Sequence, residues 1–355
     1  MQVPTTWDEL YNVLVAFKTK DPNGNGKADE IPMDWAPGMG YFNALQMLGG
    51  TGVTLTNGVS EGFHVENGTV KNFFVDERYK QLVNFLNKCQ KAGLINSEVF
   101  TQDYTKFQSV TRNPDAPVVG FTMGWDLTDR FGTQWASQYT TMAVMKPTAD
   151  YSGRLSWDYC YDNLNFGANA IVMSAKSSDK EAAMKFIDQF YNPVNSMQVL
   201  FGSIGPNIVD NGNGSYAVLP PADLKMDPGT WKWTSALADS GPMYISDTLN
   251  LTLGADMQSI AKQDEAMAPI MGQIDVKKDV FPGVFIKYSA DDNTQMALLK
   301  TNLNNLTTAK FSSWVTNGGI DKEWDAYVKD CDKAGLAQLL EIMQKYYNEY
   351  MKNNP

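Results

Sequence analysis

Apolar and polar residues recur along the chain at helical and strand periods, and these periods predict a succession of helices and strands. Helical spacing of apolar side chains predicts helices over residues 7–20, 76–92, 180–191, 292–316 and 321–350. Thr6 followed three residues later by Glu9 is a capping-box pattern, which places the start of the first helix. Gly93, after the second predicted helix, is typical of a helix C-terminus.

Short apolar runs between these helices predict strands. They cover residues 63–65, 70–74, 118–121 and 166–173. The first two flank the dipeptide Asn67-Gly68, which is a strong signal for a tight hairpin turn. Because strands alternate with helices along most of the chain, the pattern predicts an α/β fold with mainly parallel sheets.

Length and charge narrow the classes of protein. The chain has 355 residues, which at roughly 100–200 residues per domain favours two lobes. Lys and Arg number 29 against 40 Asp and Glu, so the net charge is −11. Nucleic-acid binding needs many cationic contacts to phosphates, so we expect no nucleic-acid partner. Only four of the cations are arginines, which also disfavours strongly anionic ligands.

Cysteine and histidine usage limits the chemistry further. Cys89, Cys160 and Cys331 lie far apart without CxxC spacing, so the sequence predicts neither a disulfide framework nor a zinc site, and we expect buried apolar roles. His64 is the single histidine. Any Ser-His-Asp arrangement would have to use this residue, and we expect a structural or surface role for it.

The clearest chemical motif is the loop of residues 21–32. Oxygen-bearing side chains stand at its first, third, fifth and ninth places and Gly26 at the sixth, which is the ligand rhythm of a calcium loop. The twelfth place holds Pro32 instead of the Glu that usually completes such a site, so we expect Glu30 to supply the last carboxylate. The predicted ligands of a structural Ca²⁺ are Asp21, Asn23, Asn25, the main-chain oxygen of Lys27, Asp29 and Glu30. The alternative is a solvated Asx-Gly turn.

Several blocks of sequence resemble one protein family. Residues 4–10 and 17–32 are similar to the opening block of family 1 extracellular solute-binding proteins of bacterial ABC transporters, in the branch that includes the alginate-binding proteins. Residues 167–188 resemble the strand and helix with which that family returns to its N-terminal lobe. Residues 310–350 resemble its C-terminal helices.

The resemblance implies a two-lobed, type II periplasmic-binding-protein-like fold without catalytic activity. It implies a first part of the C-terminal lobe over residues 1–165, a return to the N-terminal lobe over 166–210 and the rest of the C-terminal lobe over 211–355. Family members carry a signal peptide, a lipid anchor and a leading stretch before the opening block, so we expect an incomplete N-terminal lobe here. The implied protein is an extracellular or periplasmic monomer, anchored as a lipoprotein when full length, with an oligosaccharide and the permease subunits as partners and a structural Ca²⁺.

Aromatic residues next to polar ones are the candidate ligand contacts. Sugars offer hydroxyl groups and apolar ring faces, so their sites combine flat aromatic rings with Asp, Asn or Gln. The densest combination is residues 157–163, and a second follows the predicted strand 118–121, where side chains reach the edge of a sheet. The candidates are Trp35, Trp125, Asp126, Trp157, Asp158, Tyr159, Tyr161 and Trp231. For each, burial in the core is the competing interpretation.

Three functions stay open at this point. A binding protein and a glycoside hydrolase would use the same residues, with Asp126, Asp158 and Asp162 as the carboxylates of the hydrolase. A calcium-dependent adhesion module is the third. The sparse arginines favour a neutral glycan over a uronate polymer, and a peptide ligand is not excluded.

Overall fold

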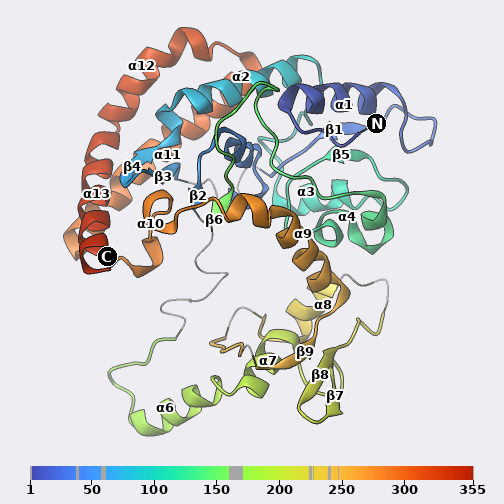
Figure 1. Ribbon diagram of the computed structural model, residues 1–355, viewed down its shortest axis with the longest axis vertical. Helices are drawn as coiled ribbons and strands as arrows, with labels where there is room; N and C mark the ends of the chain where they lie inside the picture. Colours follow the sequence, from blue (N-terminus) through green and yellow to red (C-terminus); the bar gives the residue numbers. More distant parts are fainter. Residues whose placement is uncertain are drawn as a thin grey trace. The chain divides into compact units, whose positions relative to one another are not determined.

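The computed structural model describes residues 2–36, 40–56, 61–159, 171–223, 226, 228–238, 241–246 and 248–354. The chain forms two compact units (Figure 1). The first comprises Met1–Gly124, Thr141–Phe166 and Ala266–Pro355, and the second comprises Trp125–Thr140 and Gly167–Glu265. Helix α9, Ala255–Met271, contains the last boundary between them.

The first unit mixes helices with short strands. Its α-helices are α1 (Trp7–Thr19), α2 (Glu77–Lys91), α3 (Tyr104–Thr111), α10 (Val276–Asp279), α11 (Ala290–Asn317), α12 (Ile320–Lys333) and α13 (Leu336–Asn353). Its 3-10 helices are η1 (Gly40–Phe42), η2 (Ala44–Thr51), η3 (Phe73–Val75) and η6 (Gly283–Phe285). Its strands are β1 (Ile31–Met33), β2 (Leu55–Thr56), β3 (Phe63–Glu66), β4 (Thr69–Asn72), β5 (Val119–Phe121) and β6 (Asp158–Tyr159).

Strand pairing in the first unit is mixed, whereas the pattern predicts mainly parallel sheets. Strand β1 pairs with β5, and β2 with β6, both in parallel. Strands β3 and β4 form the predicted antiparallel hairpin, with Val65 opposite Val70. Asn67 and Gly68 take positive φ angles of 51° and 77°, the conformation that a type I′ turn requires.

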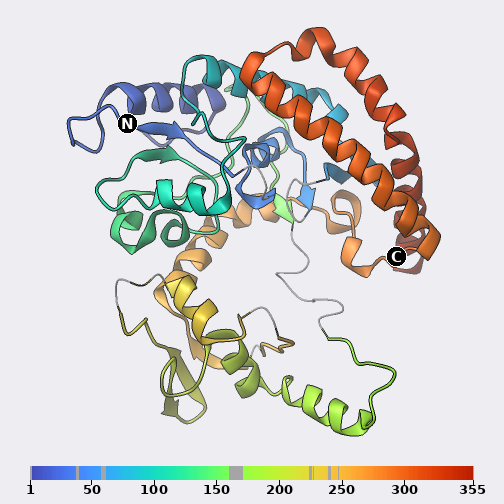
Figure 2. The ribbon, with the colours of Figure 1, turned by 180° about the vertical axis from the view of Figure 1, so that it is seen from behind.

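The core of the first unit lies between its first half and its C-terminal helices. Helices α11 and α12 contact α2, whereas α13 contacts α11, α12 and strand β4 (Figures 1 and 2). Trp314 of α11 packs edge-on against Tyr327 of α12, with ring centroids 4.7 Å apart. Both rings and that of Tyr79 are almost completely buried. The apolar stripes of these helices therefore stabilise the unit by burial, as their period predicts.

The second unit is smaller. Its elements are α4 (Leu127–Trp135), η4 (Ala136–Gln138), α6 (Lys180–Gln189), α7 (Pro193–Phe201), β7 (Ile208–Gly212), β8 (Ser215–Val218), α8 (Pro228–Ser235) and β9 (Asn250–Thr252). Strand β8 pairs antiparallel with β7 and parallel with β9. Met197, Phe201 and Ile208 form its buried cluster.

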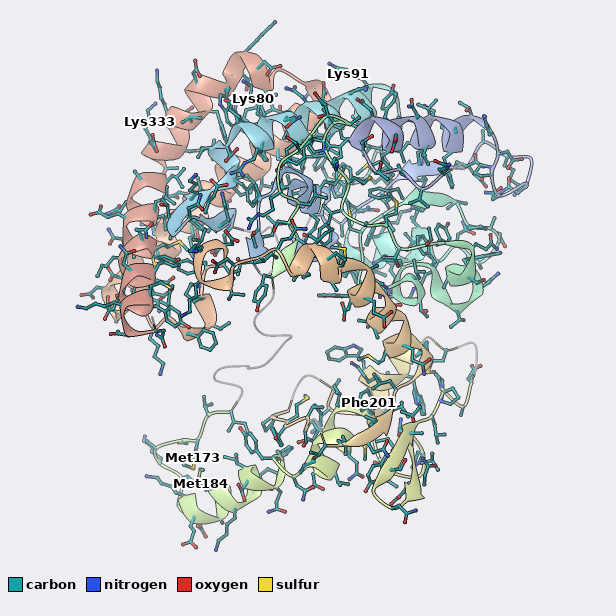
Figure 3. The ribbon with its side chains drawn as sticks, in the orientation of Figure 1. Lys80, Lys91, Met173, Met184, Phe201 and Lys333 are labelled. Atoms are coloured by element: carbon teal, nitrogen blue, oxygen red, sulfur yellow. The ribbon has the colours of Figure 1, made fainter. Side chains whose placement is uncertain are left out.

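Helix α6 differs from the other long helices, because none of its residues is buried. Its apolar side chains include Met184 and Phe186, which are 52% and 66% exposed. Figure 3 labels Met184 on this helix, and Met173 in the segment before it. Asp179 caps the helix by accepting a hydrogen bond from the backbone N–H of Ala182 at 2.8 Å.

The predicted elements and the structure differ in two places. The helix predicted over 321–350 is two helices, α12 and α13. Gly335 lies between them with φ 104°, a left-handed conformation that ends the first helix. In the strand predicted over 166–173, residues 171–173 form no strand, and 166–170 lie outside the described residues. Residues 211–265 group with 167–210 in one compact unit, and the assignment of segments to lobes stays a prediction. None of the described helices combines the length and apolar character needed to span a membrane.

Candidate functional site

Strand β6 carries the densest group of candidate ligand contacts. Trp157, Asp158 and Tyr159 are all half-buried, and the parallel pair places Leu55 opposite Asp158 and Thr56 opposite Tyr159. The carboxyl ends of both strands therefore meet at one edge, which is where ligands bind in open α/β sheets. Tyr161, Cys160 and Asp162 lie outside the described residues.

A residue that the sequence analysis missed contacts this group. The side-chain amide of Gln46 in η2 donates a hydrogen bond to Oδ2 of Asp158 at 3.3 Å. Gln46 is only 2% exposed, and every residue of η2 is buried. A single polar side chain within the apolar run 44–48 was the available signal, because a buried amide needs a polar partner.

Trp35 belongs to the core, so its candidate role as a ligand contact is corrected. The indole is 0% exposed and packs edge-on against Phe100, with ring centroids 5.7 Å apart. A sugar could reach it only if the core opened. The Gly-rich surroundings in sequence suggested a loop, but a tryptophan side chain is highly buried on average.

Trp125 and Asp126 lie at the start of α4 in the second unit. The Trp125 side chain is 44% exposed, as a stacking surface would be. Asp126 is the N-cap of α4, and its Oδ1 accepts hydrogen bonds from the backbone N–H groups of Thr128 at 2.7 Å and Asp129 at 3.0 Å. The carboxylate therefore has a structural role in starting the helix.

Trp231 lies on α8, also in the second unit. It is half-buried, and its indole nitrogen is buried without a hydrogen-bond partner among the described residues. Its neighbour Trp233 is 56% exposed, with the Lys232 ammonium 5.9 Å from the ring centroid. Of the two rings, that of Trp233 is therefore the more accessible.

The predicted calcium loop is held by hydrogen bonds among its own side chains and backbone. Asp21, Asn23 and Asn25 are half-buried, whereas the residues between them are exposed. Oδ1 of Asp21 accepts from the backbone N–H of Asn25 at 3.1 Å, and the Asn25 amide donates to the Asp29 carboxylate at 3.1 Å. Gly26 has φ 72°, the left-handed conformation expected at the sixth place.

The loop's donor set suits a hard cation. Oε1 of Glu30 is buried and has no hydrogen-bond partner among the described residues, so it is an oxygen with capacity for a ligand. Within those residues, no three His, Cys, Asp or Glu side chains converge on one point. Amide and main-chain oxygens would therefore complete the set, as calcium loops allow. Rotating the Asn25 amide would present its oxygen in place of the nitrogen that now faces Asp29.

The described cysteines are structural. Cys89 and Cys331 are fully buried thiols, which agrees with the predicted apolar role. Burial raises the pKa of the Cys89 thiol to about 12 and that of Cys331 to about 11. Neither is therefore a thiolate near neutral pH.

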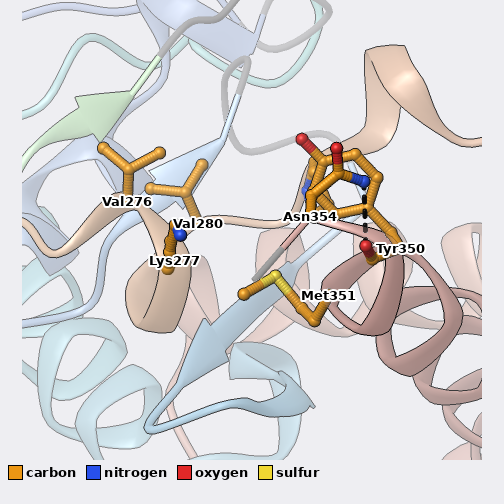
Figure 4. Close-up of a pocket in the computed structure, with 7 residues that line it drawn as sticks. Val276, Lys277, Val280, Tyr350, Met351 and Asn354 are labelled. Carbon is orange, nitrogen blue, oxygen red and sulfur yellow. Dashed lines mark hydrogen bonds between the residues drawn. The ribbon is translucent and has the colours of Figure 1, made fainter.

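A cavity lies at the end of α13, and its lining residues come from segments 276–282 and 350–354. It measures about 460 Å³ and is bounded by the residues drawn in Figure 4. Val276, Val280 and Met351 make most of its wall apolar, and the Asn354 amide donates to the carbonyl of Tyr350 at 2.9 Å. It contains none of the predicted site residues.

Two curated proteins are similar in sequence to the chain. The fructooligosaccharide ABC transporter substrate-binding protein FusA of Streptococcus pneumoniae is 29% identical over 369 residues, which is 99% of the chain and 64% of FusA. The chain therefore spans less than two thirds of this relative's length. Lipoprotein LipO of Bacillus subtilis is 32% identical over 119 residues, which is 34% of the chain and 23% of LipO. No protein-family model matches.

Solved structures of solute-binding proteins are similar to the chain in fold. An extracellular solute-binding protein from Bifidobacterium longum subsp. infantis superposes with a TM-score of 0.86 at 29% identity, over 99% of the chain and 71% of that protein. FusA in complex with kestose gives a TM-score of 0.81 at 26% identity, over 99% and 70%. A further FusA structure is an EF-hand mutant in complex with fructo-nystose.

Proposed function

We propose that this chain captures an oligosaccharide and delivers it to a membrane permease. It has the periplasmic-binding-protein-like fold of the family 1 solute-binding proteins, and its homologues include oligosaccharide-binding proteins of ABC transporters. The match to FusA and its kestose complex over 99% of the chain carries this proposal. An extracellular position as a lipid-anchored monomer is part of it, supported by the similarity to LipO.

The chemistry of β6 supports a sugar as the ligand. The rings of Trp157 and Tyr159 can pack against the C–H faces of a sugar, and the Asp158 carboxylate can accept hydrogen bonds from its hydroxyl groups. This combination favours a neutral oligosaccharide, because the chain has few arginines to bind carboxylates.

Calorimetric titration and tryptophan fluorescence test the proposal. Kestose, an alginate trisaccharide and a tripeptide mixture serve as probes, and we expect heat and a fluorescence change with a neutral oligosaccharide. Trp157→Ala should weaken that binding at least about tenfold, since one stacked aromatic contributes about 1–3 kcal/mol. Tyr191→Ala, which removes a ring that is 52% exposed beyond α6, is the matched control. Binding of the peptides alone would contradict the proposal.

The same experiment separates binding from hydrolysis. A glycoside hydrolase needs two carboxylates placed for acid and nucleophile or base roles. The Asp126 carboxylate already accepts two backbone hydrogen bonds at the start of α4. We expect kestose to be recovered intact by chromatography after long incubation. Cleavage that Asp158→Asn abolishes would establish the hydrolase instead.

A structural calcium ion in the loop of residues 21–32 is the second part of the proposal. The EF-hand mutant of FusA, the half-buried Asp and Asn side chains and the buried Glu30 oxygen support it. Asp21, Asn23, Asn25, the Lys27 main-chain oxygen, Asp29 and Glu30 would hold the ion. Bound there, it would offset most of the negative charge of the loop and fix the turn between α1 and β1.

Thermal melting with calcium and with chelator tests this part. We expect calcium to raise the melting temperature, because an ion that binds only the folded state stabilises it. Asp21→Asn keeps the shape of the side chain and removes its charge, so the calcium effect should fall strongly. Asp264→Asn, on an exposed part of α9, makes the same change away from the loop and should leave the effect intact. An equal melting temperature in calcium and chelator would refute the site.

A further inference from the structure

Gln46 is held in one orientation by two oxygen atoms. Its amide nitrogen donates to the carbonyl oxygen of Gly40 and to Oδ2 of Asp158, each at 3.3 Å. Both partners are acceptors, so the opposite amide orientation would set oxygen against oxygen. The remaining side-chain oxygen of Gln46 is buried without a hydrogen-bond partner among the described residues. The amide therefore has a fixed donor side and an acceptor with remaining capacity.

The same face of η2 also holds the two residues before Asp158. In a 3-10 helix, residues three apart lie one above the other, so Gln46 and Gly49 share a face. The Gly49 carbonyl accepts from the backbone N–H of Ser156 at 2.8 Å. A Cβ at Gly49 would lie 3.2 Å from Cε3 of Trp157 and would overlap the Ser156 carbonyl. One face of η2 thus places Ser156, Trp157 and Asp158 in sequence.

We propose that Gln46 is the positioning residue of the sugar site and directs the Asp158 carboxylate toward the hydroxyl groups of the sugar. The inference rests on the proposed function and adds to it a residue more than 100 positions away in sequence. Gln46 adds no charge of its own, so it orients the carboxylate without neutralising it. The Gln46 side chain is 2% exposed, and its removal takes away one of the groups that hold the Asp158 carboxylate in its rotamer.

Gln46→Glu gives the sharpest test, because it replaces the donor with a second carboxylate. Two carboxylates at this separation repel each other and raise the pKa of one of them. Titration with kestose at pH 8 should show at least about tenfold weaker binding than the unaltered chain. At pH 5 a proton shared by the two groups restores the hydrogen bond, and most of the affinity should return. Gln81→Glu makes the same charge change on an exposed position of α2 and should bind kestose normally at both values.

A double-mutant cycle gives an answer even if Gln46→Glu does not fold. Gln46→Leu should weaken kestose binding about tenfold in the wild-type background. In the Asp158→Asn background it should have almost no further effect, because the carboxylate that it positions is gone. A purely structural role would weaken binding equally in both backgrounds, and that result would overturn the inference.

The outcomes separate this inference from the proposed function. If the unaltered chain binds kestose and the Gln46 variants bind it equally well, the inference is wrong and the function stands. Equal loss in Gln46→Glu at pH 8 and pH 5 also contradicts it. If the unaltered chain binds neither kestose nor the alginate trisaccharide, the proposed function is wrong and the inference falls with it.

Discussion

The Arg154 guanidinium forms an ion pair with the carboxylate of Asp279, which joins residues far apart in the first unit. The Asp279 side chain is only 9% exposed and also accepts the backbone N–H of Asp275 at 2.9 Å. The second Arg154 nitrogen donates to the Gly52 carbonyl at 3.2 Å and to the Thr54 hydroxyl at 3.1 Å. One arginine thus connects the start of β2 to α10.

Removing either member of this pair should destabilise the chain. Asp279→Ala leaves the Arg154 charge partly buried without its partner, so we expect a loss of about 2 kcal/mol in the free energy of unfolding. Arg154→Met should cost a similar amount, and the double variant should cost less than the sum of the two. Urea unfolding followed by circular dichroism measures all three.

Glu181→Ala is the control for this prediction. It removes an ion pair with Lys185 in which both side chains are at least 75% exposed, so it should cost less than about 0.5 kcal/mol. Additive losses in the Arg154 and Asp279 variants would contradict the coupling.

The buried His64 should make the first unit sensitive to acid. Its side chain is 1% exposed, and burial together with the positive charge of Arg78 lowers its pKa from 6.5 to about 4, against the opposing effect of Glu66 and Asp76. The unfolded chain therefore binds a proton below about pH 6.5 that the folded chain does not bind until about pH 4. Stability that is present above pH 6.5 is lost as the pH falls, by roughly 2 kcal/mol at pH 5.

His64→Leu tests this prediction because it removes the titrating group. The variant should lose less stability than the wild type between pH 8 and pH 5, with the difference near roughly 2 kcal/mol. Urea unfolding at both pH values measures it, and the carboxylates of Glu66 and Asp76 titrate in both proteins. If the wild type and the variant lose equal stability, the His64 imidazole has the same pKa in the folded and the unfolded chain, which would contradict the prediction.

Gln344 of α13 should hold the β3–β4 hairpin in place. Its side-chain oxygen accepts the backbone N–H of Val70 at 2.7 Å, and its nitrogen donates to the Gly68 carbonyl at 3.1 Å. Gln344→Leu leaves both backbone groups without this partner, so we expect a loss of about 1–3 kcal/mol. Gln338→Leu makes the same change at an exposed position of the same helix and should change stability little. Chemical denaturation compares the two, and equal effects would refute the prediction.

Gly26 of the calcium loop should tolerate a side chain poorly for backbone reasons alone, as should Gly24. A Cβ there meets no atom within 4 Å, so the cost of Gly26→Ala comes from its φ of 72°. We expect a loss of about 1 kcal/mol in chelator. Gly283→Ala, at a position without positive φ and with ordinary contacts, is the control. No loss in Gly26→Ala would mean that the loop adopts another conformation in solution.

Local signals in the sequence predicted the local structure well. Thr6 accepts the backbone N–H of Glu9 at 3.2 Å, as the capping pattern implies, although the Glu9 carboxylate accepts from Thr5. The Asn67-Gly68 turn and the left-handed Gly93 also lie where the pattern placed them. Caps and turns depend on a few neighbouring residues, so sequence order alone contains the information.

Long-range contacts decided what the sequence could not predict. Trp35 and Trp157 are both tryptophans near glycines, yet one is in the core and the other is half-buried at the end of a strand. Gln46 gains its role from Asp158, which no spacing rule connects to it. Gly335 within an otherwise continuous helical period is a local signal that predicts the end of one helix and the start of the next.

Helix α6 buries none of its residues, and among the described residues its stabilising contacts are local. They include the Asp179 cap, the exposed Glu181–Lys185 pair and the edge-on contact of Phe186 with Phe190. Isolated helices shorter than about 12 residues are marginal in water. Its amide hydrogens should therefore exchange with deuterium earlier than those of α2 or α11, and any molecule that shields its methionine and phenylalanine side chains will slow that exchange.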